Sequence, residues 1–577
     1  MRARDLPRNA VLAIRNFLRS LRRDKLDWIV LPLHGSYPER TARRDPLPFP
    51  FNRLSLFPSE VSLEDMRGRL ETIGNDRRVR GVVLRFDTLR AGPSALYSLR
   101  RMLLDLRAQG KRVIAWLPSA STWDYYLASA CDEVVLPQPT RLLALGLRAE
   151  PVFLKDTLAL AGVEADLEAI AEYKVSPDTF RRSTMSEPHQ EMLDSLLDSL
   201  FEELIAAIAE ERGVQPARVR QLIDAMPLTP MEAVEAELID AVLYEDELRS
   251  YVSDEKHPEP ENEGDDSSCV SLLSWQEAAH WLRQPIKWST QQIIAVVSLE
   301  GLIVPGQSRR IPLPVPLPFP ERQAGAETIG QVLRCAEADK RVAAVILYVE
   351  TPGGSALASD LICHEIRRLG KRKPVVALMG GQATSGGYYV AAGANRIVAR
   401  PTTLTGSIGI WGGKFVLTEL YGKLEVGRES VHRGAMADLY SEMRPFNLEE
   451  REWIRHDLGE AYTRFKTRVA EGRGMTDEQV EKVARGRVWT GEQALEIGLV
   501  DALGDFETAL AIAKELAGLK PEREYTVSPI HPPRHAIYPL PLSEEQSLIG
   551  VGSLIEALRA LAGERVWALA PWVVQVR

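Results

Sequence analysis

An internal repeat is the feature that most constrains the fold of this chain of 577 residues. Residues 78–88 (RVRGVVLRFDT) match residues 341–351 (RVAAVILYVET), 263 positions further along. Near the end of each half, residues 229–242 (TPMEAVEAELIDAV) match residues 490–503 (TGEQALEIGLVDAL) at a spacing of 261. Because the spacing persists along most of each half, the sequence predicts two copies of one domain.

Each copy is predicted to be an α/β domain. Short runs rich in valine and isoleucine, such as 82–86 and 343–349, lack polar alternation, and helical segments such as 355–370 separate them. Continuous apolar strands between helices are typical of a parallel sheet that helices cover on both faces. The fold class is therefore α/β, with two tandem domains that each contain a parallel sheet.

Composition sets the boundaries between the segments. Residues 253–268 (SDEKHPEPENEGDDSS) are acidic and almost free of apolar side chains, which indicates a solvated linker. The predicted segments are a basic amphipathic N-terminal helix (1–27), the first repeat (28–252), an acidic linker (253–289), the second repeat (290–524) and a C-terminal tail (525–577).

The N-terminal segment has a basic and an apolar face. At helical spacing, the two faces hold Val11, Ile14, Leu18 and Leu21 on one side and Arg15, Arg19 and Arg22 on the other. Such a helix lies on an anionic membrane surface or packs on its own domain, and the sequence leaves both alternatives open. No run of about 18 apolar residues is present, so we expect no transmembrane helix. Nor do we expect a secretory signal, because Arg15 and Arg19 interrupt the apolar run.

Charge and cysteine content exclude some classes of function. The net charge of −9 and pI near 5.7 give no general basic field, so a nucleic-acid partner is not expected. The four cysteines are scattered and are expected to be free thiols in a reducing compartment. We therefore expect a cytoplasmic protein. The alternative is a cytoplasmic protein that also contacts the plasma membrane peripherally through residues 10–21.

Two glycine-rich turns in the second copy carry the chemistry. The strand 343–349 runs into Thr-Pro-Gly-Gly-Ser (351–355), and the next strand runs into Gly-Gly-Gln-Ala-Thr-Ser-Gly-Gly-Tyr-Tyr (380–389). Glycine lets the backbone turn sharply and bring its N–H groups close to a ligand. Gly354 and Gly386 are the candidate donors to an oxyanion, and Ser385 lies beside the second of them at the start of a helix.

These motifs together resemble the signal peptide peptidase A family of the crotonase-like superfamily. The resemblance rests on PGGS (352–355), on ATSGGYYVAAGANRIVA from residue 383, and on PTTLTGSIGI (401–410). It implies two crotonase-like (caseinolytic-protease-like) domains, as in the long, tandem-duplicated form of the family. It also implies Ser385 as the nucleophile and Ser407 as the residue that orients the base. In the family the base is the lysine of a tyrosine-lysine motif, which corresponds here to Lys174.

Comparison of the two copies supports this pair independently. At a spacing of 261, Lys174 falls on Ala435, so the second copy lacks the lysine. At a spacing of 263, Ser385 falls on Thr122, so the first copy lacks the serine. The first copy also has Leu-Arg-Ala (89–91) where the second has Pro-Gly-Gly. Each copy retains what the other has lost, which predicts one composite site.

The predicted activity is that of a serine endopeptidase with a serine-lysine dyad. No histidine stands between His364 and His432, and lysine acts as a base only when burial keeps it neutral. No metal or organic cofactor is expected. The resemblance implies short, unfolded, apolar peptide substrates such as signal-peptide remnants, and a homo-oligomer, a tetramer in the family. The alternatives are a catalytically inactive scaffold that binds peptides or membranes, and an acyl-CoA hydratase or isomerase.

Overall fold

A computed structural model describes six stretches of the chain: residues 5–21, 26–41, 61–253, 270–310, 322–530 and 566–569. These residues divide into two compact units. Unit 1 comprises residues 1–147 and 201–289, and unit 2 comprises residues 148–200 and 290–577. Residues 254–269 of the predicted acidic linker lie outside the described residues.

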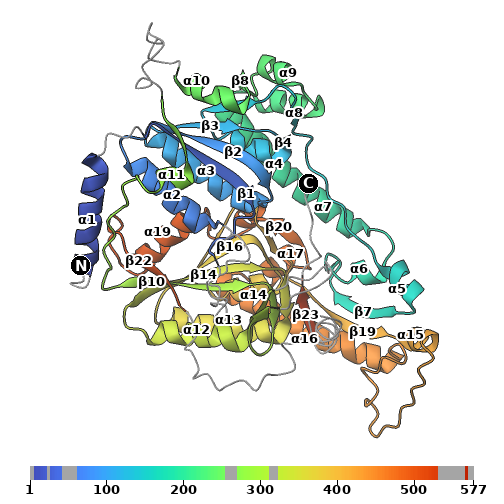
Figure 1. The fold of residues 1–577 in the computed structure, drawn as a ribbon. Coiled ribbons are helices and arrows are strands. Elements are labelled where there is room, and N and C mark those ends of the chain that lie inside the picture. Colours follow the sequence, from blue (N-terminus) through green and yellow to red (C-terminus); the bar gives the residue numbers. More distant parts are fainter. Residues whose placement is uncertain are drawn as a thin grey trace. The chain divides into compact units, whose positions relative to one another are not determined.

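Unit 1 is built on a parallel sheet (Figure 1). The strand order is β8-β5-β3-β2-β1-β9, and all five pairings in this sheet are parallel. The strands are β1 (Trp28–Gly35), β2 (Gly81–Leu89), β3 (Arg112–Trp116), β5 (Glu133–Leu136), β8 (Ala241–Val242) and β9 (Leu272–Ser274).

Helices cover both faces of this sheet, because successive side chains of a strand point to opposite sides. Ile29, Val82 and Leu84 pack with α2 (Leu63–Asn75), α3 (Pro93–Ala108) and α4 (Thr122–Ala128). Val83 and Ile114 point the other way and pack with α10 (Leu248–Ser253). Burial on both faces explains why these strands read as uninterrupted apolar runs.

Unit 2 contains a related sheet with the order β20-β18-β16-β14-β10-β22, in which β17 also pairs with β16 and β21. Its pairings are parallel except for β18 with β20. The strands are β10 (Ile293–Glu300), β14 (Val342–Thr351), β16 (Val375–Thr384), β17 (Arg396–Ala399), β18 (Leu404–Gly406), β20 (Val488–Thr490), β21 (Ala502–Leu503) and β22 (Thr526–Pro529). The predicted α/β class with parallel sheets is confirmed.

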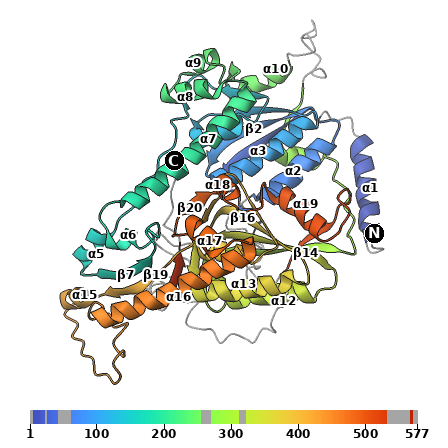
Figure 2. The same ribbon diagram turned by 180° about the vertical axis from the view of Figure 1, so that it is seen from behind.

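A second sheet in unit 2 has the order β12-β13-β11-β15-β23-β19-β7. Its strands are β7 (Glu164–Ile170), β11 (Leu302–Val304), β12 (Arg309–Arg310), β13 (Arg322–Gly325), β15 (Gly353–Ser355), β19 (Ile410–Val416) and β23 (Val566–Leu569). Figure 2 shows the long helix α16 (Leu448–Arg473) beside β7 and β19. Strands from distant parts of the chain therefore meet in one sheet.

Helices also cover both faces of the main sheet of unit 2. Val345 and Leu347 pack in the cluster that includes α13 (Ala356–Gly370) and α14 (Gly386–Ala391), which α12 (Ala326–Ala338) joins. Ala344 and Ile346 point to the other face and pack on α19 (Phe506–Leu516).

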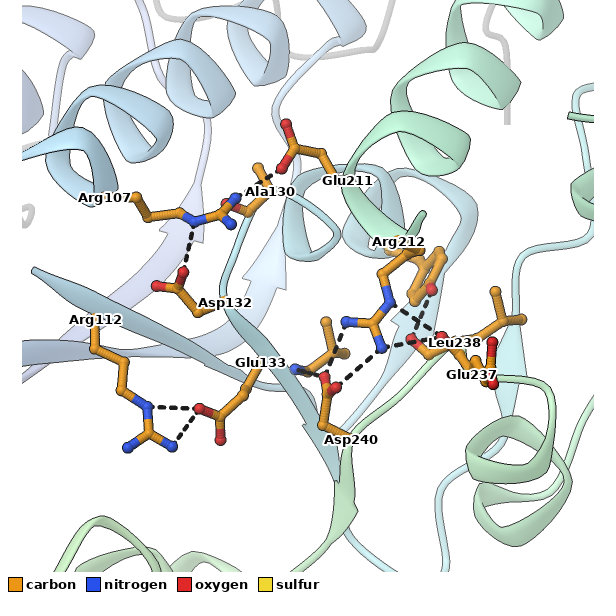
Figure 3. Close-up of polar contacts among 12 residues, drawn as sticks. Arg107, Arg112, Ala130, Asp132, Glu133, Glu211, Arg212, Glu237, Leu238 and Asp240 are labelled. Atoms are coloured by element: carbon orange, nitrogen blue, oxygen red, sulfur yellow. Dashed lines mark hydrogen bonds and ion pairs between the residues drawn. The ribbon is translucent and has the colours of Figure 1, made fainter. Parts of the chain in front are cut away.

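The same polar cluster recurs in each unit, as expected for a duplication. In unit 1, Arg212 donates to the carbonyl oxygen of Glu237 and pairs with Asp240 at 2.9 Å (Figure 3). In unit 2, at a spacing of 261 residues, Arg473 donates to the carbonyl oxygen of Gly498 and pairs with Asp501 at 2.8 Å. The corresponding tyrosine hydroxyls, of Tyr125 and Tyr388, donate to the carbonyl oxygens of Leu238 and Leu499.

The compact units differ from the repeats in three places. Residues 148–200 belong to the first repeat in sequence but to unit 2 in structure, because β7 pairs with β19. Residues 272–278, within the predicted linker, form β9 and α11 (Trp275–Ala278) on the sheet of unit 1. The predicted tail supplies β22 and β23. In each case a segment pairs with strands that lie far from it in the sequence, which composition alone did not indicate.

Candidate active site

The turn between β16 and α14 holds Ser385. This serine is the single residue between the end of the strand and the start of the helix. Its backbone has φ 54° and ψ −111°, a conformation that non-glycine residues rarely adopt. Its amide donates to the carbonyl oxygen of Gly406 at 2.7 Å. A strained strand-to-helix turn is the geometry that presents a nucleophilic serine in α/β-hydrolases.

Ser407 lies at the end of the neighbouring strand. Thr384 of β16 pairs with Gly406 of β18, so the residues that come after them, Ser385 and Ser407, leave the sheet at adjacent strand ends. Ser407 also has a positive φ, 52°, and its amide donates to the carbonyl oxygen of Arg487 at 2.7 Å. Both serines are completely buried.

Pairing of β7 with β19 carries Lys174 to the same place. Ile170 at the end of β7 is in register with Ile410 at the start of β19, directly after the Ser407 turn. The chain then turns at Ala171 (φ 76°), and the amide of Tyr173 donates to the carbonyl oxygen of Arg485 at 3.1 Å. The whole candidate site, lysine included, therefore lies within unit 2.

The Lys174 amine contacts both serines. Its Nζ lies 2.7 Å from Ser385 Oγ, 3.1 Å from Ser407 Oγ and 3.0 Å from the carbonyl oxygen of Ser407. A neutral amine has two N–H groups and one lone pair. If the two N–H groups are donated to Ser407, the lone pair remains to accept the hydroxyl proton of Ser385. The contacts match a base that is ready to take that proton.

Burial lowers the pKa of Lys174 well below its ordinary value of about 10.4. The side chain is only 1% exposed, and desolvation of the charged form is the cause of the shift. A carboxylate close to the amine would oppose this effect by stabilising the ammonium. The site thus favours the neutral amine that general-base chemistry needs.

Two glycines that the sequence analysis missed make room for this lysine. A Cβ on Gly486 (φ 82°) would lie 2.4 Å from the Lys174 backbone nitrogen, and a Cβ on Gly409 would lie 3.1 Å from the lysine Cδ. Their signals in sequence were weak, because Arg-Gly-Arg (485–487) and Ser-Ile-Gly (407–409) resemble ordinary turns. Only the approach of a distant chain segment explains them.

The two predicted oxyanion donors lie on elements that contact each other. Gly386 is the first residue of α14, and the first amides of a helix have no partner within it. Gly354 is in β15, which contacts α14. A Cβ on Gly387 would lie 2.6 Å from Thr351 Cγ2, so its missing side chain permits this approach. The structure therefore brings the Gly354 loop to the helix that starts directly after Ser385.

The first copy has an ordinary helix start at the position of the nucleophile. Thr122 is the first residue of α4 and donates its hydroxyl to the carbonyl oxygen of Gly146 at 3.1 Å. The preceding Ser121 caps the helix with a relaxed φ of −74°. Neither the strained turn nor the lysine contact of Ser385 recurs there.

A strand from the C-terminal tail lies next to the glycine loop. β23 pairs antiparallel with β15, in the register Gly354 with Ala568, and also with β19, where Trp411 is opposite Trp567. The two tryptophan rings are stacked with centroids 6.2 Å apart. An extended peptide is thus accommodated between the strand that carries Gly354 and the strand that comes after the Ser407 turn.

Comparison with known families matches both halves of the chain. The family described as Peptidase family S49 matches residues 105–257 and again residues 367–520. The two matches begin 262 residues apart, which agrees with the spacing of the internal repeat. The predicted tandem duplication is confirmed.

Characterised relatives are similar along most of the chain. The serine protease SPPA of Arabidopsis thaliana chloroplasts is 32% identical over 505 residues, which are 87% of this chain and 73% of that protein. Protease 4 of Salmonella typhi is 30% identical over 80% of this chain and 73% of its own length. Protease 4 of Haemophilus influenzae is 29% identical over 80% of this chain and 74% of its own length.

Proposed function

This chain belongs to peptidase family S49, and from that premise we propose that Ser385 attacks the peptide bond while Lys174 acts as general base. The protein is a serine-type endopeptidase. Family membership decides against an acyl-CoA hydratase or isomerase and against an inactive scaffold. The single observation that carries the dyad is the 2.7 Å contact between Lys174 Nζ and Ser385 Oγ in a buried site.

The reaction proceeds through an acyl-enzyme. Lys174 takes the hydroxyl proton as Ser385 Oγ bonds to the carbonyl carbon. The resulting ammonium gives that proton to the leaving amine as the C–N bond breaks. Water then attacks the ester carbon, its proton passing to Lys174. The resulting ammonium returns that proton to Ser385 Oγ as the ester C–O bond breaks and the second product leaves. Contact with Ser407 holds the amine in place throughout.

Backbone amides stabilise the negative charge that develops on the carbonyl oxygen. We assign the two donors to Gly354 and Gly386, at the glycine loop and at the start of α14. The dipole of even a short helix, with its unpaired first amides, favours an anion at that end. No metal or cofactor is needed in this scheme.

The substrate is an extended peptide that pairs with the edge of β15. Strand addition binds a peptide through its main chain and so accepts many sequences, but only when the peptide is unfolded. The position of β23 between β15 and β19 supports this mode of binding. Short apolar peptides such as signal-peptide remnants, which the family resemblance implies, fit a path next to buried Trp411.

Covalent labelling tests the nucleophile and the base together. A fluorophosphonate probe is expected to modify Ser385, and the labelling rate is expected to fall tenfold for each pH unit below the pKa of Lys174. The sign is set by protonation: below that pKa the amine is an ammonium and cannot accept the serine proton. Mass spectrometry of the adduct, across a pH series, measures both.

The control is the Ser385→Ala variant, which must not form the adduct. An adduct on another serine, or a rate independent of pH where the protein remains folded, would contradict the proposal. Peptide cleavage that survives in Ser385→Ala would do so as well.

Removal of β23 is expected to raise activity toward short peptides. Because β23 occupies the proposed substrate position, it competes with the substrate. The apparent affinity of the enzyme for the peptide is then its intrinsic affinity multiplied by the fraction of molecules in which that position is free. A chain that ends at residue 560 should show a several-fold lower KM than the full chain, measured with a fluorogenic apolar peptide.

A chain that ends at residue 570 is the matched control, because it keeps residues 566–569 and loses only residues 571–577. It should retain the KM of the full chain. An equal KM in all three proteins would show that β23 does not lie in the substrate path.

Assembly and location complete the proposal. By resemblance to the family we propose a homo-oligomer, a tetramer, in the cytoplasm. Free buried thiols at Cys131 and Cys363 support a reducing compartment.

A further inference from the structure

Helix α1 (Asp5–Leu21) is attached to unit 1 by its polar face. Figure 1 shows this helix (dark blue) at the outer edge of the unit. Its contacts go to the segment 282–289: Asp5 with the amide of Ser289, Asn9 with the carbonyl oxygen of Lys287, Asn16 with the carbonyl oxygen and amide of Gln284, and Arg19 with the carbonyl oxygen of Leu282. Asp5 and Asn9 are buried. The polar side chains of this helix therefore form the inner face.

The apolar face of the same helix points away from the protein. Five large apolar side chains on one arc of the helix are each between 51 and 61% exposed: Leu6, Val11, Ile14, Phe17 and Leu18. Soluble proteins rarely leave such side chains together on one face. A helix that packs on its own domain buries its apolar stripe instead. Of the two alternatives that the sequence leaves open, packing of the apolar face on the domain is therefore excluded by its exposure.

Basic residues flank the exposed apolar face. Arg8 and Arg15 are exposed and lie along one edge of it at helical spacing. Both line the hollow between α1 and α2, where Arg8 also donates to the carbonyl oxygen of Lys287 at 3.0 Å. In sequence, residues 1–25 carry eight basic and two acidic side chains, although the chain as a whole has a net charge of −9. An apolar face bordered by arginines complements a surface that is apolar inside and negatively charged at its rim.

We propose that α1 is a membrane-surface anchor that lies in the headgroup region of an anionic bilayer, with Leu6, Ile14 and Phe17 in the acyl boundary. Arg15 binds lipid phosphate, and the contacts of Arg8 and the asparagines keep the helix on unit 1. None of the helices in the described ranges is long and apolar enough to cross a membrane. Attachment is therefore parallel to the surface, and it delivers the peptidase to peptides that partition into lipid.

Vesicle sedimentation of the full chain tests the proposal. The protein is expected to bind vesicles of phosphatidylcholine with about 30 mol % phosphatidylglycerol, and to bind phosphatidylcholine alone much more weakly. The double variant Ile14→Ser, Phe17→Ser should bind the anionic vesicles at least about tenfold more weakly, because two exposed apolar side chains no longer enter lipid. Arg15→Gln should weaken the preference for the anionic vesicles.

The matched control removes two exposed apolar side chains elsewhere, Val431→Ser and Leu448→Ser, which are 88 and 83% exposed. It should bind vesicles as the wild type does. Cleavage of a soluble peptide should be unchanged in the α1 variants, so failure of the anchor is distinguishable from failure of the peptidase. Absence of vesicle binding by the wild type would overturn the proposal. A concentration-dependent dimer that the Ile14→Ser, Phe17→Ser variant abolishes, without lipid binding, would instead identify a contact between two copies.

Discussion

Replacement of Lys174 by methionine is expected to lower kcat/KM by about 1,000-fold or more. Loss of either catalytic partner in serine hydrolases has effects of this size or larger. Methionine has nearly the length of lysine and no charge, so it fills the same buried volume while removing the base. The measurement is cleavage of an unfolded apolar peptide, with the fluorophosphonate labelling rate of Ser385 as a second readout.

The same variant is expected to be more stable than the wild type near neutral pH. Lys174 is protonated in the unfolded chain and neutral in the fold, since burial lowers its pKa. The unfolded state then binds the extra proton, so the stability of the wild type rises with pH until the unfolded lysine also titrates. Methionine removes that dependence. The difference in Tm between the two proteins should therefore shrink as pH rises toward the ordinary lysine pKa of about 10.4.

Two control variants distinguish loss of the general base from the structural effect of removing a buried lysine. Lys373 also has a pKa lowered by burial, but it donates to the carbonyl oxygens of Ala336 and Asp339, so Lys373→Met should keep its activity. Lys174→Arg should be as inactive as the methionine variant, because arginine does not lose its proton in proteins. Retention of even a tenth of wild-type activity in Lys174→Met would contradict the dyad.

The sequence predicted the candidate site because most of its residues lie in short local motifs. Ser385 stands in a glycine-rich turn, and the loss of its counterpart at Thr122 is visible by alignment of the two copies. Lys174 is indicated by the tyrosine-lysine motif of the family resemblance, and the same comparison of the copies supports it. The α/β class is indicated by apolar strands of the kind that a covered parallel sheet requires.

Pairing between strands that lie far apart in the sequence could not be predicted from local patterns. β7 joins β19 across 240 to 252 residues, and this pairing places Lys174 in the second unit rather than with the rest of its repeat. A strand of mixed composition such as Glu164–Ile170 has no local signal for its partner. For the same reason, Gly409 and Gly486 could not be recognised as the glycines that make room for the lysine.

The spacing of apolar and polar residues in α1 also did not determine which face of the helix lies against the protein. A pattern of apolar and polar residues defines two faces, but it does not say which face the protein covers. Asn9 and Asn16 decide this, since their amides reach backbone carbonyls of the segment 282–289. Asparagine is seldom fully buried, so the sequence did not predict that the polar face of α1 lies against the protein.

Gly354→Ala is the change expected to have the second-largest effect, about 100- to 1,000-fold in kcat. Loss of one oxyanion donor costs this much in other serine hydrolases. A Cβ at position 354 would lie 2.0 Å from the carbonyl oxygen of Ile303, and the backbone φ of 156° is one that alanine rarely adopts. The β15 strand must therefore shift away from β11, and the amide of residue 354 moves with it.

The pH profile distinguishes this loss from a general disturbance of the site. Since neither Ser385 nor Lys174 contacts the new methyl group, the acid limb of kcat/KM should keep its wild-type position while the plateau falls. Gly330→Ala, in helix α12 of the same unit, is the matched control: its Cβ meets no atom closer than 3.4 Å. That control should stabilise the protein by roughly 0.5–1 kcal/mol and leave kcat unchanged. A Gly354→Ala enzyme within about threefold of wild-type kcat, well below the range set by a lost donor, would remove Gly354 from the oxyanion site. Gly386 would then be the one proposed donor left.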